Sequence, residues 1–347
     1  LVRSLPTDTN GTLYHLIWEQ EDEAHGSLIR VGMFSLETLK MPLDASKMPI
    51  GRPVHTTNNL LHNLTCCGLG FDNSGRFLAI GDWSGLISVW PVRQSSTAAR
   101  STSELDINIK PFNSPRHCPT HVPAAKIPLT QSMVRALVWN QHPYNDGRTT
   151  IMVGDLSGRL LECGLRETDS GDFEVLSPVK IARTNRTICC MSWSPEAPCS
   201  YLVDESSPWK CFLAAGDSSG ILRIYGRAKS DDSLTLLVSF QAHEQMPHVT
   251  SRDIWTLTFS PCGKYIATGC EDYTVHVYKF AIENDAGLEQ IATLEGPDAA
   301  VTCIDWQETP MGSMLIVASD DRTIHCWSQE NKDSGDLRLF RVIRTNW

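Results

Sequence analysis

The sequence predicts an all-β protein built from six copies of one small antiparallel unit. The best-preserved copy spans residues 253–280, where alternating apolar residues indicate three short strands separated by two turns. Residues 260–263 (SPCG) form the first turn, because proline presets φ and glycine tolerates a positive φ. Asp272 lies in the second turn, where its side chain can cap backbone N–H groups. One such unit cannot bury both of its faces alone, so it requires neighbours of the same kind.

The first strand of each copy follows one rule: apolar, two variable, apolar, one variable, aromatic. Six segments obey it: LYHLIW (13–18), CCGLGF (66–71), VRALVW (134–139), ICCMSW (188–193), IWTLTF (254–259) and VTCIDW (301–306). Self-similarity of this kind is the sequence signature of a fold made of repeated units.

The second and third strands repeat as well. Three copies share a Gly-Asp-x-Ser-Gly turn, at 81–85, 154–158 and 216–220, and residues 316–327 supply another copy with Asp321 in the place of Asp272. A catalytic site needs one unique copy, whereas this turn recurs between strands, so we interpret it as structural.

A fourth, outer strand is predicted to link each unit to the next, for example at 173–176, 234–240 and 290–294. The C-terminal segment 337–343 (LRLFRVI) has the same character, but no further unit follows it. We therefore expect it to be the outer strand of the first unit. That arrangement would close a ring and remove the open sheet edges.

These repeats resemble those of WD-repeat β-propellers, most clearly in SPCGKYIATGCEDYTVHVY and ASDDRTIHCW. The resemblance runs from about residue 13 to the end. It implies a β-propeller of four-stranded antiparallel blades, with six recognisable repeats in a ring of six or seven blades. We expect residues 1–347 to form this single domain, and we expect the chain to be part of a longer one.

The resemblance also implies structural roles for a few residues. The family's glycine–histidine pair survives only as Ala242-His243, and no copy of its tryptophan–aspartate pair is intact. In the fifth unit Asp272 is expected to pair with His243, with Tyr278 in the place of the tryptophan. In the sixth unit Asp321 and Trp327 hold the corresponding positions.

Two insertions interrupt the repeats. Residues 93–125 are rich in Ser, Thr and Pro and lack periodicity, which predicts an excursion between the second and third units. Residues 196–208 lengthen a turn inside the fourth unit. Neither stretch has the apolar residues needed to form a core.

Composition narrows the class of protein. The formal net charge of −10 argues against non-specific binding of nucleic acid, because such binding needs clustered Lys and Arg. Most of the 12 cysteines lie within apolar strand patterns, which favours reduced thiols and an intracellular protein of the nucleus or cytoplasm. No run of about 18 apolar residues is present, so we expect no insertion into a membrane.

The motifs that the sequence contains favour a protein that is not an enzyme. No phosphate-binding loop, nucleophile elbow or His-Glu-x-x-His helix occurs. Residues 117–121 (HCPTH) form the one compact group of metal-ligand types, and zinc needs four ligands. We therefore expect no catalytic residue, no cofactor and no bound metal.

The resemblance places peptide binding on one rim of the central channel, at the turns that precede each first strand and the turns around Asp272. Tryptophan and arginine are the residues most enriched at interface hot spots. The residues predicted to bind protein on this rim are Trp83, Arg135, Arg186, Arg252, Trp255, Glu271, Asp320 and Arg322.

These observations favour a non-catalytic interaction scaffold, a WD-repeat subunit of a larger intracellular multiprotein complex. Its partners would be other subunits and peptide segments, with nucleic acid reached only through the complex. Two alternatives stay open. One is a reader of a peptide or modified histone, in which Trp83, Trp255 and the rim carboxylates surround a cationic group. The other is a nucleic-acid-associated subunit, if the four rim arginines share one rim.

Overall fold

The structure is a computed structural model, and every regular element in the residues that it describes is a β-strand. The described residues are 2–4, 12–20, 27–35, 66–72, 77–82, 84–91, 124–129, 132–142, 144, 146–168, 173–195, 207–244, 251–281, 287–309, 312–329 and 337–344. Across these ranges no helix is present that could span a membrane.

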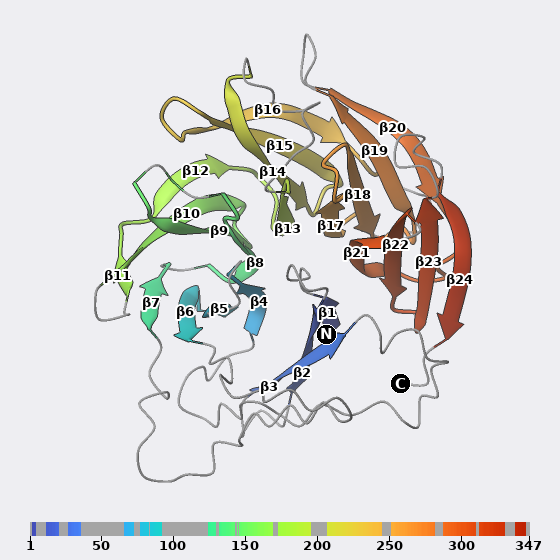
Figure 1. Cartoon of the computed structure of the whole chain (residues 1–347), viewed down its shortest axis with the longest axis horizontal. Coiled ribbons are helices and arrows are strands. Elements are labelled where there is room, and N and C mark those ends of the chain that lie inside the picture. The colour runs from blue at the N-terminus through green and yellow to red at the C-terminus, as the bar shows by residue number, and fades with distance from the viewer. Residues whose placement is uncertain are drawn as a thin grey trace.

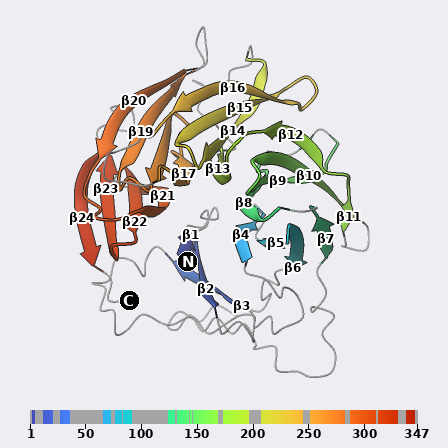
Figure 2. The same cartoon turned by 180° about the vertical axis from the view of Figure 1, so that it is seen from behind.

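Six antiparallel sheets, the blades, surround a common centre, seen from the two sides in Figure 1 and Figure 2. Blade one contains β1 (Val2–Ser4), β2 (Thr12–Gln20) and β3 (Ser27–Ser35). Blade two contains β4 (Cys66–Phe71), β5 (Phe77–Asp82), β6 (Leu86–Pro91) and β7 (Ala125–Pro128). Blade three contains β8 (Val134–Trp139), β9 (Thr149–Asp155) and β10 (Arg159–Glu167), with β11 (Phe173–Val175) and β12 (Val179–Arg183) both paired to β10.

The last three blades have four strands each. Blade four contains β13 (Ile188–Trp193), β14 (Trp209–Asp217), β15 (Ile221–Ala228) and β16 (Leu234–Gln241). Blade five contains β17 (Ile254–Phe259), β18 (Tyr265–Cys270), β19 (Val275–Ala281) and β20 (Gly287–Leu294). Blade six contains β21 (Val301–Thr309), β22 (Gly312–Ser319), β23 (Thr323–Gln329) and β24 (Arg338–Arg344). The predicted all-β fold of four-stranded antiparallel blades is confirmed.

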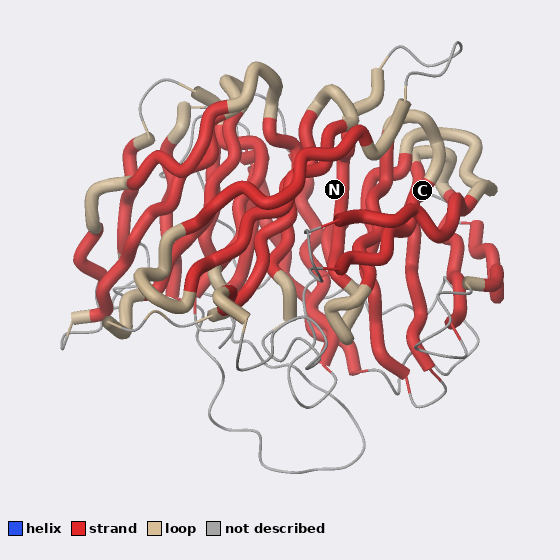
Figure 3. The backbone as a smooth tube through the Cα atoms, turned by 90° about the horizontal axis from the view of Figure 1, so that it is seen from above, coloured by secondary structure: helices blue, strands red, loops and turns tan. Residues whose placement is uncertain are grey.

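The hydrophobic cores lie between neighbouring blades. Buried side chains of blades two and three form one cluster, and further clusters join blades three and four, four and five, and five and six. A blade therefore buries each face against the next sheet rather than within itself. In the side view of Figure 3, the strands run between two rims at which the described turns gather.

Close packing of the blades explains the Gly-Asp-x-Ser-Gly turns. A Cβ atom on Gly154 would lie 2.5 Å from Cγ2 of Ile188 in the next blade, so only glycine allows the two sheets to approach. The last glycine of the same turn, Gly158, has a φ of +79°, which other residues rarely adopt. The first glycine of the motif therefore permits close packing of neighbouring blades, and the last permits the positive φ of the turn.

The prediction for the C-terminal strand is wrong. β24 pairs with β23 of its own blade, in the register Ile324 to Ile343, and not with the first blade. The connection from β23 to β24 is short, and the closure entropy of a local hairpin is smaller than that of a pairing across the whole chain. The first blade instead contacts the last through β1 and β21.

Two other expectations are corrected by the strand order. The segment 13–18, expected to be a first strand, lies in β2, the middle strand of blade one. The insertion at 93–125 joins β6 to β7, which pair within blade two, so it does not connect two blades. The greater part of that insertion lies outside the described residues.

Candidate functional site

The inner strands of five blades carry a β-bulge at the same position. The pairing register shifts around the second residue of β4, β8, β13, β17 and β21, at Cys67, Arg135, Cys189, Trp255 and Thr302. A bulge leaves the extra residue out of the ladder and redirects its side chain. Because the inner strands surround the centre (Figure 1), these five positions form a ring that carries Cys, Arg, Cys, Trp and Thr in chain order.

Three of the predicted rim residues meet at this ring. The guanidinium carbon of Arg135 lies 4.5 Å from the centroid of the Trp255 ring, a cation–π contact. The Trp255 Nε1 atom donates a hydrogen bond of 2.5 Å to Oε2 of Glu271. All three side chains are half-buried. Two inner strands far apart in sequence and the turn after β18 therefore place an arginine, a tryptophan and a carboxylate in one chain of contacts.

Two further residues complete this group. The backbone N–H of Glu271 donates to the carbonyl oxygen of Asp253 at 3.1 Å. Cys189 is buried, and burial together with the charge of Asp253 raises the pKa of its thiol to about 12, although Arg135 acts in the opposite direction. We call Arg135, Cys189, Asp253, Trp255 and Glu271 the channel-mouth cluster.

The electrostatics of the channel-mouth cluster suit binding better than catalysis. The thiolate is the nucleophilic form of cysteine, and at neutral pH the raised pKa of Cys189 keeps its thiol protonated. The carboxylate of Glu271 is held by the indole N–H, and that of Asp253 accepts a 2.6 Å hydrogen bond from the Ser251 hydroxyl. What the group offers a ligand is an aromatic face, one guanidinium and two carboxylates.

The other predicted rim residues lie elsewhere on the turns. Arg186 is exposed, in a turn where its backbone N–H donates to Oγ1 of Thr184 at 3.3 Å. Arg252 is half-buried, next to Asp253 in the chain. Asp320 and Arg322 are exposed on the turn between β22 and β23. Trp83 lies outside the described residues.

Sequence reasoning missed Cys189, Asp253 and one rim aromatic, Tyr273. Tyr273 has a φ of 71° and is 39% exposed. Gly269 pairs with Val275 as Gly216 pairs with Leu222, so Tyr273 occupies the place of Gly220, which has a φ of 76°. The signal was present in the repeat alignment: where a turn position is glycine in other copies, a large residue there indicates a projected side chain.

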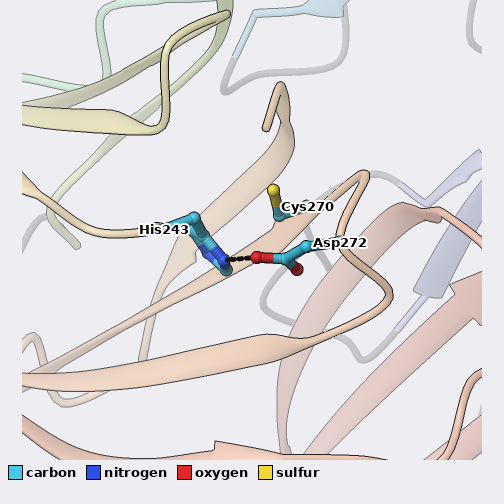
Figure 4. Close-up of side chains that lie close together, drawn as sticks. All are labelled: His243, Cys270 and Asp272. Carbon is cyan, nitrogen blue, oxygen red and sulfur yellow. Dashed lines mark hydrogen bonds and ion pairs between the residues drawn. The ribbon is translucent and has the colours of Figure 1, made fainter. Parts of the chain in front are cut away.

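Figure 4 shows a trio that has the residue types of a metal site, His243, Cys270 and Asp272. Both ring nitrogens of His243 are already engaged: Nδ1 lies 2.8 Å from Asp272 Oδ2, and Nε2 lies 2.9 Å from Thr268 Oγ1. A metal ligand needs a free ring nitrogen. We therefore interpret the trio as a buried hydrogen-bond network that ties the segment before β17 to the turn after β18.

This network holds its aspartate ionised. Burial by itself would raise the pKa of Asp272, but the hydrogen bond and charge of His243, with hydrogen bonds from Thr274, lower it to about 2. Thr274 donates to Oδ1 from its N–H at 3.0 Å and from its hydroxyl at 2.7 Å. The Tyr278 hydroxyl donates to the Ala242 carbonyl at 2.6 Å and so fixes the same segment.

Aspartates at or beside this turn are held in different ways in the other blades. Oδ2 of Asp321 accepts a 2.7 Å hydrogen bond from the N–H of Asp298, and Trp327 packs against the core between blades five and six. In blades three and four the aspartate that ends the second strand, in the place of Cys270, pairs with an arginine of the third strand. These pairs are Asp155 with Arg159 and Asp217 with Arg223, both at 2.5 Å.

Two segments of the chain match the family model described as "WD domain, G-beta repeat", residues 234–279 and 288–328. The first runs from β16 into β19, and the second from β20 into β23. Each matched repeat therefore begins with the outer strand of one blade and continues through three strands of the next. These two segments of the chain are therefore WD repeats, and each repeat runs from one blade into the next.

One curated relative also matches part of the chain. The protein named "Protein transport protein sec13" from Emericella nidulans is 26% identical over 98 residues. The aligned part is 28% of this chain and 28% of that protein. The similarity therefore spans little more than a quarter of the relative.

Proposed function

We propose that this WD-repeat β-propeller is a non-catalytic interaction scaffold, a subunit of a larger multiprotein complex. The observation that carries the proposal is the ring of bulged residues on the inner strands. The blades repeat their packing residues, yet the bulge position carries four residue types in five blades, and three blades contribute to the channel-mouth cluster. Arg135 and Trp255 at this position are half-buried, and a partly open residue that the repeat does not copy is what binding of a specific partner requires, because packing alone would favour repetition.

The chemistry of the cluster supports a protein ligand. Tryptophan and arginine are the most enriched hot-spot residues, and Trp255 and Arg135 are half-buried, so part of each remains open to a partner. The N–H of Trp255 and the guanidinium of Arg135 are held in place before binding, which lowers the entropy cost of association.

We further propose a reducing compartment, the nucleus or the cytoplasm. All eight cysteines whose side chains the structure describes are free thiols, and six of them are buried. Free buried thiols are typical of intracellular proteins. The name of the partial relative describes a protein transport protein, and a part in protein transport is a proposal for this chain that rests on 98 aligned residues.

The test is purification of the tagged full chain from its own cells with quantitative mass spectrometry of the proteins that co-purify. We expect partners in near-equal amounts with the wild type, and their loss with Trp255→Ala. The matched control is Arg166→Ala, which changes an exposed residue on β10. A wild-type chain that purifies as a monomer without partners would contradict the scaffold function. Partners retained by Trp255→Ala would contradict the assigned surface.

A second candidate, a reader of a cationic side chain, is favoured by one contact. Arg135 already lies over the Trp255 ring, whose N–H is bonded to the Glu271 carboxylate, so the aromatic face accepts a guanidinium. A ligand arginine or lysine would take the place of Arg135. Under this function Arg135→Ala strengthens binding of a cationic peptide, measured by calorimetry, whereas a scaffold contact made by Arg135 predicts weaker binding of the partner.

A further inference from the structure

The outer strands of four blades also carry a bulge at a shared position. The register shifts opposite the third strand leave one residue out of the ladder in each blade: Ile181 in β12, Leu237 in β16, Ile291 in β20 and Phe340 in β24. These four residues are equivalent in the repeat, and all four are large and apolar.

Three of the four pack onto the blade that follows. Ile181 packs against the core shared by blades three and four, Leu237 against the core of blades four and five, and Ile291 against the core of blades five and six. The bulge therefore has a defined use, because it turns an apolar side chain toward the next sheet. This contact seals the outer part of each junction between blades.

Phe340 breaks the pattern, since its side chain is 63% exposed. Leu339 and Val342 on the same strand are 48% and 44% exposed, so the last blade exposes a strip of apolar side chains along β24 that Arg341 interrupts. The first blade contacts the last through β1 and β21 near the centre, whereas β24 is the outermost strand (Figure 1). An exposed strip of this kind on a soluble domain marks an interaction surface.

The charge beside the strip indicates what covers it. Arg338, Arg341 and Arg344 are all exposed on the same seven-residue strand. They concentrate positive charge in a chain whose formal net charge is −10. A complementary ligand supplies apolar side chains for Phe340 and carboxylates for the three arginines, because like charges across an interface are costly.

We propose that the strip formed by 338–344 on β24 is a docking surface for an acidic, apolar segment of a partner protein, which covers Phe340 as the following blade covers Leu237 and Ile291. This inference rests on the proposed scaffold function. It adds a second surface on the outside of the last blade, separate from the channel-mouth cluster on the inner strands.

The test uses a fluorescent synthetic peptide that alternates glutamate with leucine and valine, titrated into the full chain at low salt and followed by anisotropy. We expect saturable binding to the wild type, and binding at least about tenfold weaker for Phe340→Ser and for Arg341→Glu. The matched control, Leu236→Ser on the outer strand β16, binds as the wild type does, and Trp255→Ala shows whether the peptide goes to the channel mouth instead. Leu236 is 48% exposed, so the control removes a similar apolar surface.

Several results would overturn the inference. They are undiminished binding by Phe340→Ser, equal binding of a peptide with lysine in place of glutamate, and no binding by the wild type. Self-association that Phe340→Ser abolishes would assign the strip to a second copy of this chain, and also overturns the inference. Binding lost only in Trp255→Ala would contradict the strip while supporting the channel-mouth surface, so the two proposals fail separately.

Discussion

Arg135 stacks on Trp255 at 4.5 Å, although the first belongs to the inner strand of blade three and the second to that of blade five. Blade four lies between these two blades in chain order, so the contact joins blades that are not neighbours. Both residues are bulged out of their ladders, and neither is constrained by the repeat pattern. The channel mouth is thus fixed by side chains rather than by strand pairing, and its strength can be measured without knowledge of any partner.

A double-mutant cycle on this pair is expected to give a coupling free energy of about 0.5–1 kcal/mol, the value of a partly exposed cation–π contact. The variants are Arg135→Met, Trp255→Leu and the double, each measured by urea unfolding. The control cycle combines Arg135→Met with Val179→Ala on β12, where the free energies of unfolding should add. A coupling of zero for the first pair would show that the stacking contributes nothing in solution.

Gly269→Ala is expected to lower the free energy of unfolding by about 1–3 kcal/mol, as overpacking does in a close-packed core. A Cβ at this position would lie 2.4 Å from Cγ1 of Val301 and 2.8 Å from Cδ1 of Ile304, both in the next blade. The added variant Val301→Ala removes the nearest atom, so the double should be more stable than the sum of the two single effects predicts. Simple additivity would contradict the close approach of the blades.

Acid is expected to weaken the fold through Asp272. Its pKa is lowered in the fold from 3.8 to about 2, so its stabilisation is complete above about pH 4 and is lost as the pH falls toward 2. The loss corresponds to about 2 kcal/mol, and Asp272→Asn should remove this part of the pH dependence of unfolding. The control is Asp320→Asn, which changes an exposed carboxylate on a neighbouring turn. Equal pH profiles for Asp272→Asn and the wild type would contradict the network.

The blades could be predicted from sequence because packing repeats at fixed spacing. The rule for the first strand found β4, β8, β13, β17 and β21 with their bounds almost correct. The contact of Arg135 with Trp255 could not be predicted, since it depends on how three blades are arranged and on bulges that a strand pattern does not show. The prediction of which strand pairs with β24 was wrong for a related reason: apolar alternation indicates a strand but does not identify its neighbour.

The candidate site was predicted in part for the same reasons. Residue type and position at a rim predict Arg135, Trp255 and Glu271, and the structure brings these three residues into contact. Cys189 was overlooked because it reads as one of two adjacent core cysteines, and its neighbour Cys190 does pack in the core between blades four and five. The bulge at the second residue of β13 explains why Cys189 lies in the channel-mouth cluster while Cys190 lies in the core.

A buried ion pair joins blades three and four within the described core. Arg227 is 1% exposed, and its guanidinium donates to Oε1 of Glu162 at 2.7 Å. Tyr144 donates to the same carboxylate oxygen, and the rings of Tyr144 and Trp193 lie 4.3 and 4.9 Å from the guanidinium carbon. The Nε and Nη1 atoms of Arg227 have no hydrogen-bond partner within the described part of the chain.

Removal of one member of this pair is expected to be far more costly than removal of an exposed pair. Arg227→Ala leaves the carboxylate of Glu162 buried without its counter-charge, so the free energy of unfolding should fall by about 3–5 kcal/mol. Arg166→Ala, which breaks the exposed pair with Glu174, should cost no more than about 1 kcal/mol. The apolar double variant Arg227→Met with Glu162→Leu should recover most of the loss, because neither buried charge remains and the unpartnered donors of Arg227 are gone. If urea unfolding ranked the double variant below Arg227→Ala, the pair would be stabilising in itself rather than costly when broken.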